Sequence, residues 1–182
     1  MTKRRIINRI LFHTGKKLLK VVSLFNHRLY MRYYIPFLRR FGMSIYGTPR
    51  YIGINVVFDD FDLIALGNNV VISDECHFLT HDYSYTTGMR AIGKTFTSDI
   101  AIKKSISIGD NVFIGKKTII MPGCTVGDNV IIGAGSVIRG SLDSNFVYTG
   151  NPAQKIKSID QLAKKWEKVI ESDSLKIDEN SN

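Results

Sequence analysis

One histidine in this chain stands where its side chain could carry out acid–base chemistry. His81 lies in the segment Leu79-Thr80-His81-Asp82-Tyr83, where a regular repeat ends. A neutral imidazole has a pKa near neutrality, so it can remove the proton from a hydroxyl or amine as that group attacks a carbonyl carbon. The alternative is a histidine that only hydrogen-bonds its own loop. Asp82 could orient the imidazole, contact a substrate or serve only as a turn residue.

The elements that must position His81 follow a six-residue period. Neither a helix nor an ordinary strand produces this period, whereas a parallel β-helix does. Three sixes then form one coil of a triangular prism of about 18 residues, with the aliphatic residue pointing inward. Gly follows four of the seven aliphatic residues and permits the turn. The period runs through Ile102, Ile108, Ile114, Ile120, Val126, Ile132 and Ile138.

A second position, four residues after each aliphatic residue, holds a small or aliphatic side chain that fills the corner of the prism. Both cysteines occupy this position: Cys76 follows Ile72 and Cys124 follows Ile120. We therefore interpret them as small buried hydrophobic residues without a redox role. Two cysteines form no disulfide framework and fit a reducing cytoplasm. The residues at this position in the regular part are Ile106, Val112, Thr118, Cys124, Val130, Ser136 and Leu142.

The prism is predicted to extend over residues 46–157. Residues 46–81 follow a less regular version of the period, and its register slips by two between Ile64 and Leu66. Residues 82–100 lose the pattern, so we expect a loop extruded from the prism. A loop of this kind in an otherwise regular β-helix is usually functional. The expected inward residues of the first part are Ile52, Ile64, Leu66, Ile72 and Phe78.

Three repeats and a closing segment resemble a known family. Ile108-Gly109-Asp110-Asn111-Val112, Val126-Gly127-Asp128-Asn129-Val130 and Ile132-Gly133-Ala134-Gly135-Ser136 are similar to the hexapeptide repeats of the left-handed β-helix acyltransferases, and Gly150-Asn151-Pro152-Ala153 to the segment after their last coil. The pattern is most like that of sugar or capsular-polysaccharide O-acetyltransferases and maltose or galactoside acetyltransferases. The resemblance implies a mainly β fold, a left-handed parallel β-helix. Its handedness comes from the family, because the usual crossover preference would predict the reverse.

The resemblance also implies an activity: transfer of an acetyl group from acetyl-CoA to a hydroxyl of a sugar or cell-envelope glycan. His81 would act as the general base in one direct step, because the family places its catalytic histidine at such a junction in a similar Thr-His-Asp context. A preorganised donor, such as a backbone N–H, would stabilise the oxyanion. We expect Asn55, Asp60, Asp82 and Tyr83 to contact the acceptor. Asn55 and Asp60 lie about one to one and a half coils upstream of His81 and could face it across a subunit boundary.

In relatives, coenzyme A runs along late coils and its phosphates meet basic residues near the C-terminal end. The sequence departs from the usual pattern at Ile138-Arg139-Gly140, where relatives often carry Thr-Lys-Asp, although Arg139 keeps the charge. A lysine taken alone is more often a solvated surface charge. Family members typically form trimers with sites between neighbouring subunits, and a homotrimer is expected here. The matching cofactor-binding positions are Gly133, Ala134, Ser136, Arg139, Lys155 and Lys157.

The formal net charge of +9 belongs to the N-terminal part. Residues 1–58 contain twelve of the 25 Lys and Arg and none of the 16 Asp and Glu, so 13 basic and 16 acidic residues remain elsewhere. Apolar stripes predict helices over residues 1–45, with Gly15 separating two helices and Pro36 ending or bending the second. This segment could cap the first coil or lie on an anionic membrane surface, and the two are compatible. A basic patch alone does not predict nucleic-acid binding.

No stretch approaches the roughly 20 apolar residues of a membrane span, and Lys16, Lys17 and Lys20 interrupt any signal-peptide core. The expected location is the cytoplasm, including the inner face of the membrane. Residues 158–182 form the C-terminal part, where Ser158 and Gln161 indicate a capping box. A helix over 159–171 is expected to pack on the last coil, and residues 172–182 are polar.

Three other functions compete with the first. A small-molecule or antibiotic acetyltransferase on the same fold is the nearest variant. A non-catalytic scaffold would need neither His81 nor a groove for coenzyme A. A zinc enzyme resembling the β-helix carbonic anhydrases would need three histidine ligands. Only two of the histidines lie in or near the repeat, so no metal is expected. The four are His13, His27, His77 and His81.

Overall fold

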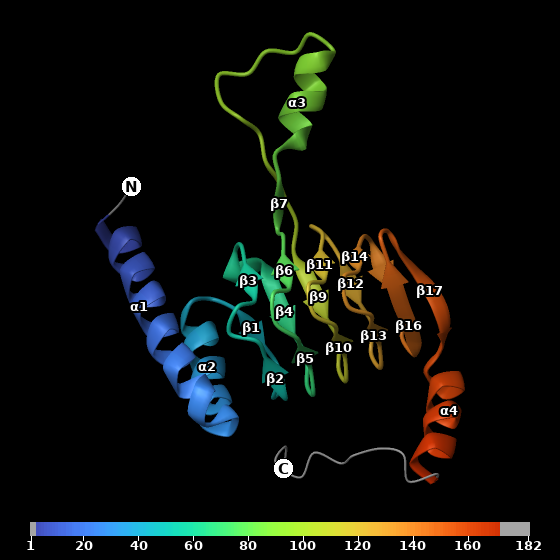
Figure 1. Cartoon of the computed structure of the whole chain (residues 1–182). Coiled ribbons are helices and arrows are strands. Elements are labelled where there is room, and N and C mark those ends of the chain that lie inside the picture. Colours follow the sequence, from blue (N-terminus) through green and yellow to red (C-terminus); the bar gives the residue numbers. More distant parts are fainter. Residues whose placement is uncertain (1–2, 172–182) are drawn as a thin grey trace.

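The repeat folds into a triangular prism with one parallel sheet on each face. The structure is a computed structural model that describes residues 3–171 (Figure 1). The first sheet contains β1 (Ser44–Ile45), β4 (Ile64–Leu66), β9 (Ile106–Ile108), β12 (Thr125–Val126) and β15 (Ser141–Leu142). The second contains β2 (Tyr51–Ile52), β5 (Val71–Ile72), β10 (Phe113–Ile114), β13 (Ile131–Ile132), β16 (Phe146–Gly150) and, antiparallel to β16, β17 (Ala153–Ser158). The third contains β3 (Val57–Phe58), β6 (His77–Phe78), β11 (Ile119–Ile120) and β14 (Val137–Ile138).

The predicted inward positions form the core. Ile114 pairs with Ile132 and Ile120 with Ile138, so each coil adds eighteen residues. The small-residue position is buried too, and Cys76 and Cys124 are both inaccessible. Ile102 is a correction, because its side chain is 38% exposed and it lies outside the coils. The buried aliphatic and aromatic residues at the predicted inward positions are Ile52, Ile64, Leu66, Ile72, Phe78, Ile108, Ile114, Ile120, Val126, Ile132 and Ile138.

The Gly-Asp-Asn turns explain why glycine is needed after the inward residue. A Cβ on Gly109 would lie 2.4 Å from a carboxylate oxygen of Asp128 in the next coil. That carboxylate accepts a hydrogen bond from the backbone N–H of Asp110 at 2.7 Å. Asn111 adopts a positive φ and donates its side-chain amide to Asn129. The side chains at this edge therefore replace hydrogen bonds that the short strands cannot make.

The predicted slip of register has a simple origin. The short 3-10 helix η1 (Phe61–Leu63) fills the turn between β3 and β4. The turn places the inward Phe58 and Leu66 eight positions apart, whereas inward residues of a regular repeat are six positions apart. Ile64 and Leu66 are both buried in β4, so the coil resumes after the insertion without loss of the core.

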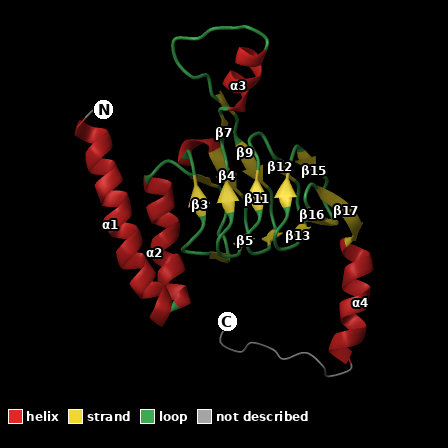
Figure 2. Ribbon diagram, turned by 45° about the horizontal axis from the view of Figure 1, so that its top comes forward, coloured by secondary structure: helices red, strands yellow, loops and turns green. Residues whose placement is uncertain are grey.

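Two helices cover the N-terminal end of the prism, as Figure 2 shows. They are α1 (Lys3–Phe25) and α2 (His27–Arg40). One local prediction was wrong. Gly15 does not end the first helix, because a Cβ at this position would lie 2.6 Å from the Phe37 ring and glycine permits the close contact of the two helices. Pro36 lies inside α2 and does not end it, because the buried Ile35 and Leu38 on either side hold the helix against its neighbours.

The pair of helices α1 and α2 caps the first coil through specific contacts. The buried Tyr30 hydroxyl donates to the Ile52 carbonyl at 2.6 Å, and Arg39 donates to the Ile45 carbonyl at 2.9 Å. These bonds satisfy backbone groups at the exposed end of the sheets. The capping interpretation of the N-terminal segment is therefore confirmed. Among the described helices, none combines the length and hydropathy that a membrane crossing requires.

The C-terminal helix α4 (Ile159–Glu171) has the predicted extent. Its capping box is present, because Ser158 and Gln161 exchange hydrogen bonds of 3.2 Å between side chains and backbone N–H groups. The expected packing of this helix on the last coil is not observed. The chain leaves the prism after β17, and Trp166 and Ile170 remain 47% and 60% exposed (Figure 1). Ile159 and Trp166 border an open pocket on the outer face of the second sheet. The polar tail from residue 172 lies outside the described residues.

The extruded segment is an arm with its own structure. Its stem pairs β7 (His81–Asp82) with β8 (Ile102–Lys103) in antiparallel fashion, and its tip carries α3 (Ser84–Ala91). Thr86 closes the arm by bonding both the backbone N–H and the carbonyl of Ile100. Figure 1 shows the arm projecting away from the prism. The exposed Ile102 belongs to this stem, which is why its match to the period is accidental.

Candidate active site

The edge between the third and first sheets, from which the arm leaves, gathers the polar side chains around His81. We name it the arm edge; it consists of the turns that follow β3, β6, β11 and β14. Asp59 and Asp60 follow β3, and Thr80 and His81 follow β6. Because Phe58 and Phe78 pair in register, the two turns lie one above the other. The repeat thus brings together residues that are about twenty positions apart in the sequence.

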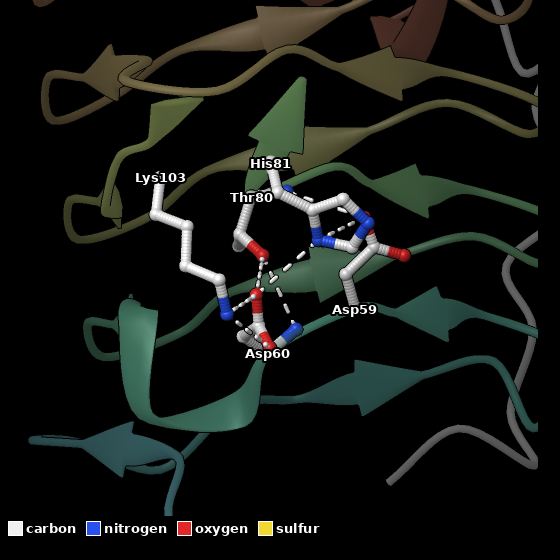
Figure 3. Close-up of polar contacts among 5 residues, drawn as sticks. All are labelled: Asp59, Asp60, Thr80, His81 and Lys103. Carbon is white, nitrogen blue, oxygen red and sulfur yellow. Dashed lines mark hydrogen bonds and ion pairs between the residues drawn. The ribbon is translucent and has the colours of Figure 1, made fainter. Parts of the chain in front are cut away.

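Asp60 is the centre of this cluster (Figure 3). Its Oδ2 accepts a hydrogen bond from the Thr80 hydroxyl at 2.8 Å and lies 3.3 Å from Nδ1 of His81. Its backbone N–H donates to Thr80 Oγ1 at 3.2 Å. Asp59 adds a second carboxylate, with Oδ2 at 3.6 Å from the same ring nitrogen. Two carboxylates from one turn of the first coil therefore lie beside the same edge of the imidazole, at Nδ1.

Opposing effects act on the carboxyl of Asp60. Partial burial by itself would raise its pKa, but hydrogen bonds from Thr80, Lys103 and His81 favour the charged form and together hold the pKa below its usual value. Lys103 Nζ lies 3.2 Å from Asp60 Oδ2. The carboxylate is therefore anionic at neutral pH and available to stabilise a positive charge on the ring.

This geometry sets the chemical role of each nitrogen of the imidazole. A carboxylate beside Nδ1 favours the tautomer that carries the proton on Nδ1, and the lone pair then lies on Nε2. The His81 side chain is 33% exposed, so part of the ring is accessible to a small hydroxyl. When Nε2 takes a proton, Asp60 and Asp59 stabilise the imidazolium that results. The arrangement is that of a general base with an orienting carboxylate.

The sequence interpretation placed Asp60 in the acceptor site and left the orienting residue open. Within the chain, Asp60 contacts His81 directly, without a subunit boundary between them. Asp59 and Lys103 were not identified as part of the site. The only signal for Asp59 is its place next to Asp60 in a turn, and nothing in the sequence relates Lys103 to the site. The pairing of His81 with Lys103 across the stem brings the lysine there.

Asp82 and Tyr83 lie at the start of the arm. The Asp82 carboxylate accepts a hydrogen bond from the backbone N–H of Ser84 at 2.8 Å, which lowers its pKa. Asp82 therefore supports the arm, and it is Asp60 that faces the imidazole. The Tyr83 ring meets the His81 ring edge-on, with centroids 5.5 Å apart, and is 53% exposed. Its contact with an acceptor stays a prediction.

A pocket of about 160 Å3 lies farther along the arm edge; Asp82 and Ile102 of the arm stem line it, whereas His81 does not. Its polar lining comes from Asp82, Lys104 and Arg139, and its apolar lining from Ile102, Met121 and Pro122. The turns after β11 and β14 supply Met121, Pro122 and Arg139. Arg139 is thus the one predicted cofactor-binding residue that shares this pocket.

Asn55 lies away from His81 within the chain. It follows β2, at the edge between the second and third sheets. Its side-chain amide donates to Asp74 at 2.6 Å and its carbonyl oxygen accepts from Lys20 at 3.3 Å. Any contact of Asn55 with an acceptor would therefore require another copy of the chain, and it stays a prediction.

The other predicted cofactor-binding residues are distributed over different places. Gly133, Ala134 and Ser136 lie in the turn after β13, at the same edge as Asn55 and not at the arm edge. Ser136 is a correction: its side chain is fully buried, and its hydroxyl bonds the Gly133 carbonyl and the Gly150 N–H. A surface ligand cannot reach this hydroxyl, because the small-residue position faces the interior. Ala134 is exposed at the same turn.

The two lysines near the C-terminal end differ. Lys155 forms an ion pair with Asp143, which raises its pKa, and lies 4.0 Å from the centroid of the Phe146 ring. Lys157 is partly buried in β17, and within residues 3–171 it has no ion-pair partner. Lys157 is therefore the freer of the two for binding a phosphate. Within the same residues, no group of three or more His, Cys, Asp or Glu side chains is arranged to hold a metal ion.

Similarity to known proteins agrees with this geometry. Residues 105–140 match the family described as bacterial transferase hexapeptide (six repeats). Protein CapG of Staphylococcus aureus is 38% identical over 125 residues, which cover 68% of this chain and 70% of CapG. WbbJ of Escherichia coli K12, provisionally named a lipopolysaccharide biosynthesis O-acetyl transferase, is 30% identical over 71% of this chain and 68% of its own. Several other curated relatives are matched over only 56% to 61% of their length.

Solved structures show the same architecture. A maltose O-acetyltransferase from Clostridium difficile 630 superposes with a TM-score of 0.51 at 30% identity, covering 81% of this chain and 88% of that one. A hexapeptide-repeat acetyltransferase of Vibrio cholerae in complex with acetyl coenzyme A has a TM-score of 0.51 at 20% identity, over 81% and 86% of the two chains, and shows the fold alone. The repeat, the prism and the extent of these matches together show that this chain belongs to the hexapeptide-repeat acetyltransferases, which share the left-handed parallel β-helix.

Proposed function

We propose that this enzyme transfers an acetyl group from acetyl-CoA to a hydroxyl group of a sugar or cell-envelope glycan. The observation that carries the proposal is the imidazole of His81, which is 33% exposed and held at Nδ1 by Asp60, with Asp59 beside the same nitrogen. This is the apparatus of a base that acts on a weakly acidic hydroxyl. A scaffold protein would need neither the hydrogen bonds around Asp60 nor a partly exposed imidazole beside two carboxylates.

The proposed reaction has one chemical step. The acceptor hydroxyl gives its proton to Nε2 of His81 while its oxygen attacks the thioester carbonyl carbon. The carbon–sulfur bond then breaks, and the thiolate of coenzyme A leaves. Asp60 stabilises the imidazolium through Nδ1 during this step, and a preorganised backbone N–H could stabilise the oxyanion. An acyl-enzyme at a cysteine is disfavoured because Cys76 and Cys124 are buried and burial raises the pKa of both thiols.

Support for a carbohydrate acceptor comes from the relatives. The C. difficile structure is named for maltose, and the E. coli relative WbbJ for lipopolysaccharide biosynthesis. The arm adds a local argument, because its stem carries Asp82 and Tyr83 beside His81. Carboxylates and aromatic rings of this kind bind hydroxyl groups and the apolar faces of sugar rings.

The positions of the predicted cofactor residues support a site shared between copies. Arg139 lies at the arm edge, whereas Gly133 and Ala134 lie at another edge of the same prism. One chain cannot bring both edges to one acetyl-CoA molecule. A cyclic assembly, in which the arm edge of one copy faces the other edge of its neighbour, would do so. We therefore propose a homotrimer as the working form, with Arg139 and Lys157 available for the phosphates.

The test measures thiol release from acetyl-CoA with a panel of sugars and oligosaccharides. For His81→Ala we expect acceptor-dependent release to fall by roughly 10²- to 10⁴-fold, as for a lost general base. His77→Ala is the matched control, because His77 is an exposed histidine on β6 of the same coil. Equal release by wild type and His81→Ala would remove His81 from the mechanism. Absence of both release and coenzyme A binding would favour a scaffold.

A further inference from the structure

Helix α1 carries an apolar stripe that the fold leaves in solvent. We name it the outer stripe; its members recur at intervals of three, four and seven residues, which places them along one side of the helix. Leu18 and Phe25 are 69% and 84% exposed. A continuous stripe of this length on a surface helix indicates an interaction site. The outer stripe consists of Ile7, Ile10, Leu11, Leu18, Val21 and Phe25, all at least 48% exposed.

The fold does not need the outer stripe, because α1 packs through different residues. Phe12 contacts the rings of Phe37, Phe41 and Phe61, and Leu19 is buried. Lys16 reaches the Val56 carbonyl at 3.1 Å. The helix thus has one side that caps the prism and a second apolar side that faces away from the packing contacts. Stability of the chain explains the first side only.

The charge of the N-terminal part that contains the outer stripe has one sign. Residues 1–58 contain twelve Lys and Arg and no Asp or Glu. Among the described side chains of the cap, Lys17, Arg28, Arg32 and Arg40 are exposed and form no ion pair within residues 3–171. Arg28 and Arg32 also line an open groove of about 380 Å3 on α2, with Pro36 and Thr48. A cap that carries both unpaired basic residues and an exposed apolar stripe suits a surface that combines anions with hydrocarbon.

We propose that the helical cap docks the enzyme on an anionic lipid surface, with the outer stripe inserted among the acyl chains and the basic residues against the headgroups. A second copy of the cap fits poorly, because two surfaces with no acidic residue would repel each other. A nucleic acid would use the basic residues but not the aliphatic stripe. The docked cap would place His81, in the second of five coils spaced about 4.8 Å apart, near the membrane end of the prism.

The test is flotation of the full chain with lipid vesicles. Wild type is expected to float with phosphatidylcholine vesicles that contain phosphatidylglycerol, and much less with phosphatidylcholine alone. The double variant Leu18→Glu/Phe25→Glu should lose at least about tenfold in partition coefficient, because two inserted side chains become charged. Arg28→Gln/Arg32→Gln should lose roughly fivefold per charge at low salt, and less at high salt, where screening already weakens the attraction.

Matched controls separate docking through the cap from nonspecific binding of exposed apolar residues to vesicles. Ile92→Glu/Ile170→Glu replaces two residues, 69% and 60% exposed, that lie outside the cap, and it should float like wild type. Melting curves of all variants should coincide, because none of the changed side chains is buried. Failure of wild type to float with the anionic vesicles would overturn the proposal. Flotation of Leu18→Glu/Phe25→Glu at the wild-type level would also overturn it. A smaller assembly of this double variant than of wild type in light scattering would overturn it too, because that result would identify the outer stripe as a contact between copies.

Discussion

Replacement of Asp60 by asparagine removes one negative charge beside the His81 ring and keeps the shape of the side chain. The Asp60 Oδ2 to Nδ1 distance is 3.3 Å, and the carboxylate also holds Thr80 and Lys103. An asparagine could still bond Nδ1 through its oxygen, but it cannot stabilise an imidazolium by charge. The variant therefore tests the electrostatic role of Asp60 separately from its size.

The expected magnitude follows from the contact. A hydrogen bond to a charged group contributes about 1.5–3 kcal/mol, and each 1.36 kcal/mol in the barrier is tenfold in rate. The full range is thus about 10- to 150-fold in kcat. The two side chains are 33% and 27% exposed, so solvent screens the pair and we expect about 10- to 30-fold.

The assay is steady-state thiol release at saturating acetyl-CoA, with kcat and KM determined separately. Because Asp60 acts through the ring, kcat should fall while KM for acetyl-CoA stays within about twofold. Asp62→Asn is the control, since Asp62 is an exposed acid in the following η1 turn. A folded Asp60→Asn enzyme with wild-type kcat would refute the assignment of Asp60 as the residue that positions and stabilises the base.

Three further outcomes are expected. The pKa of Asp60 is lowered in the folded state, so its stabilising effect is complete above the unfolded value of 3.8 and is lost as pH falls through the folded value. As pH falls below 3.8, the melting temperature of wild type should therefore drop more than that of Asp60→Asn. Ser136→Ala should lower the free energy of unfolding by about 1–2 kcal/mol and leave KM for acetyl-CoA unchanged, because its hydroxyl bonds only backbone groups; a raised KM would return Ser136 to the cofactor site. Gly109→Ala should cost at least about 2 kcal/mol in chemical denaturation, since its Cβ would lie 2.4 Å from Asp128, and a wild-type midpoint would contradict the close approach of the coils.

Much of the prism could be predicted from the sequence because its geometry is periodic. An inward position every sixth residue and a small residue at each corner follow directly from one coil stacking on the next. The buried Ile114, Ile132 and Cys124 confirm this. The capping box at Ser158 was predictable for a similar reason, since its two hydrogen bonds join residues three positions apart.

Predictions that depended on long-range packing were less successful. Ile102 matches the period but lies in the stem of the arm, because spacing alone does not show where a coil is interrupted. Gly15 suggested a helix end, whereas it accommodates the ring of Phe37 from the second helix. The apolar face of α4 predicted packing on the last coil, yet the chain leaves the prism before the helix begins.

The sequence was sufficient for the fold and for the family, and it singled out His81 as the candidate base, because period, motif and imidazole chemistry are all local properties. It could not show that Asp60 and Lys103 surround His81, or that Arg139 and Gly133 lie at different edges. Those relations depend on which turns stack and where the arm returns to the prism. Such contacts join residues twenty to forty-three positions apart, and the free energy that selects them comes from the packing of whole coils.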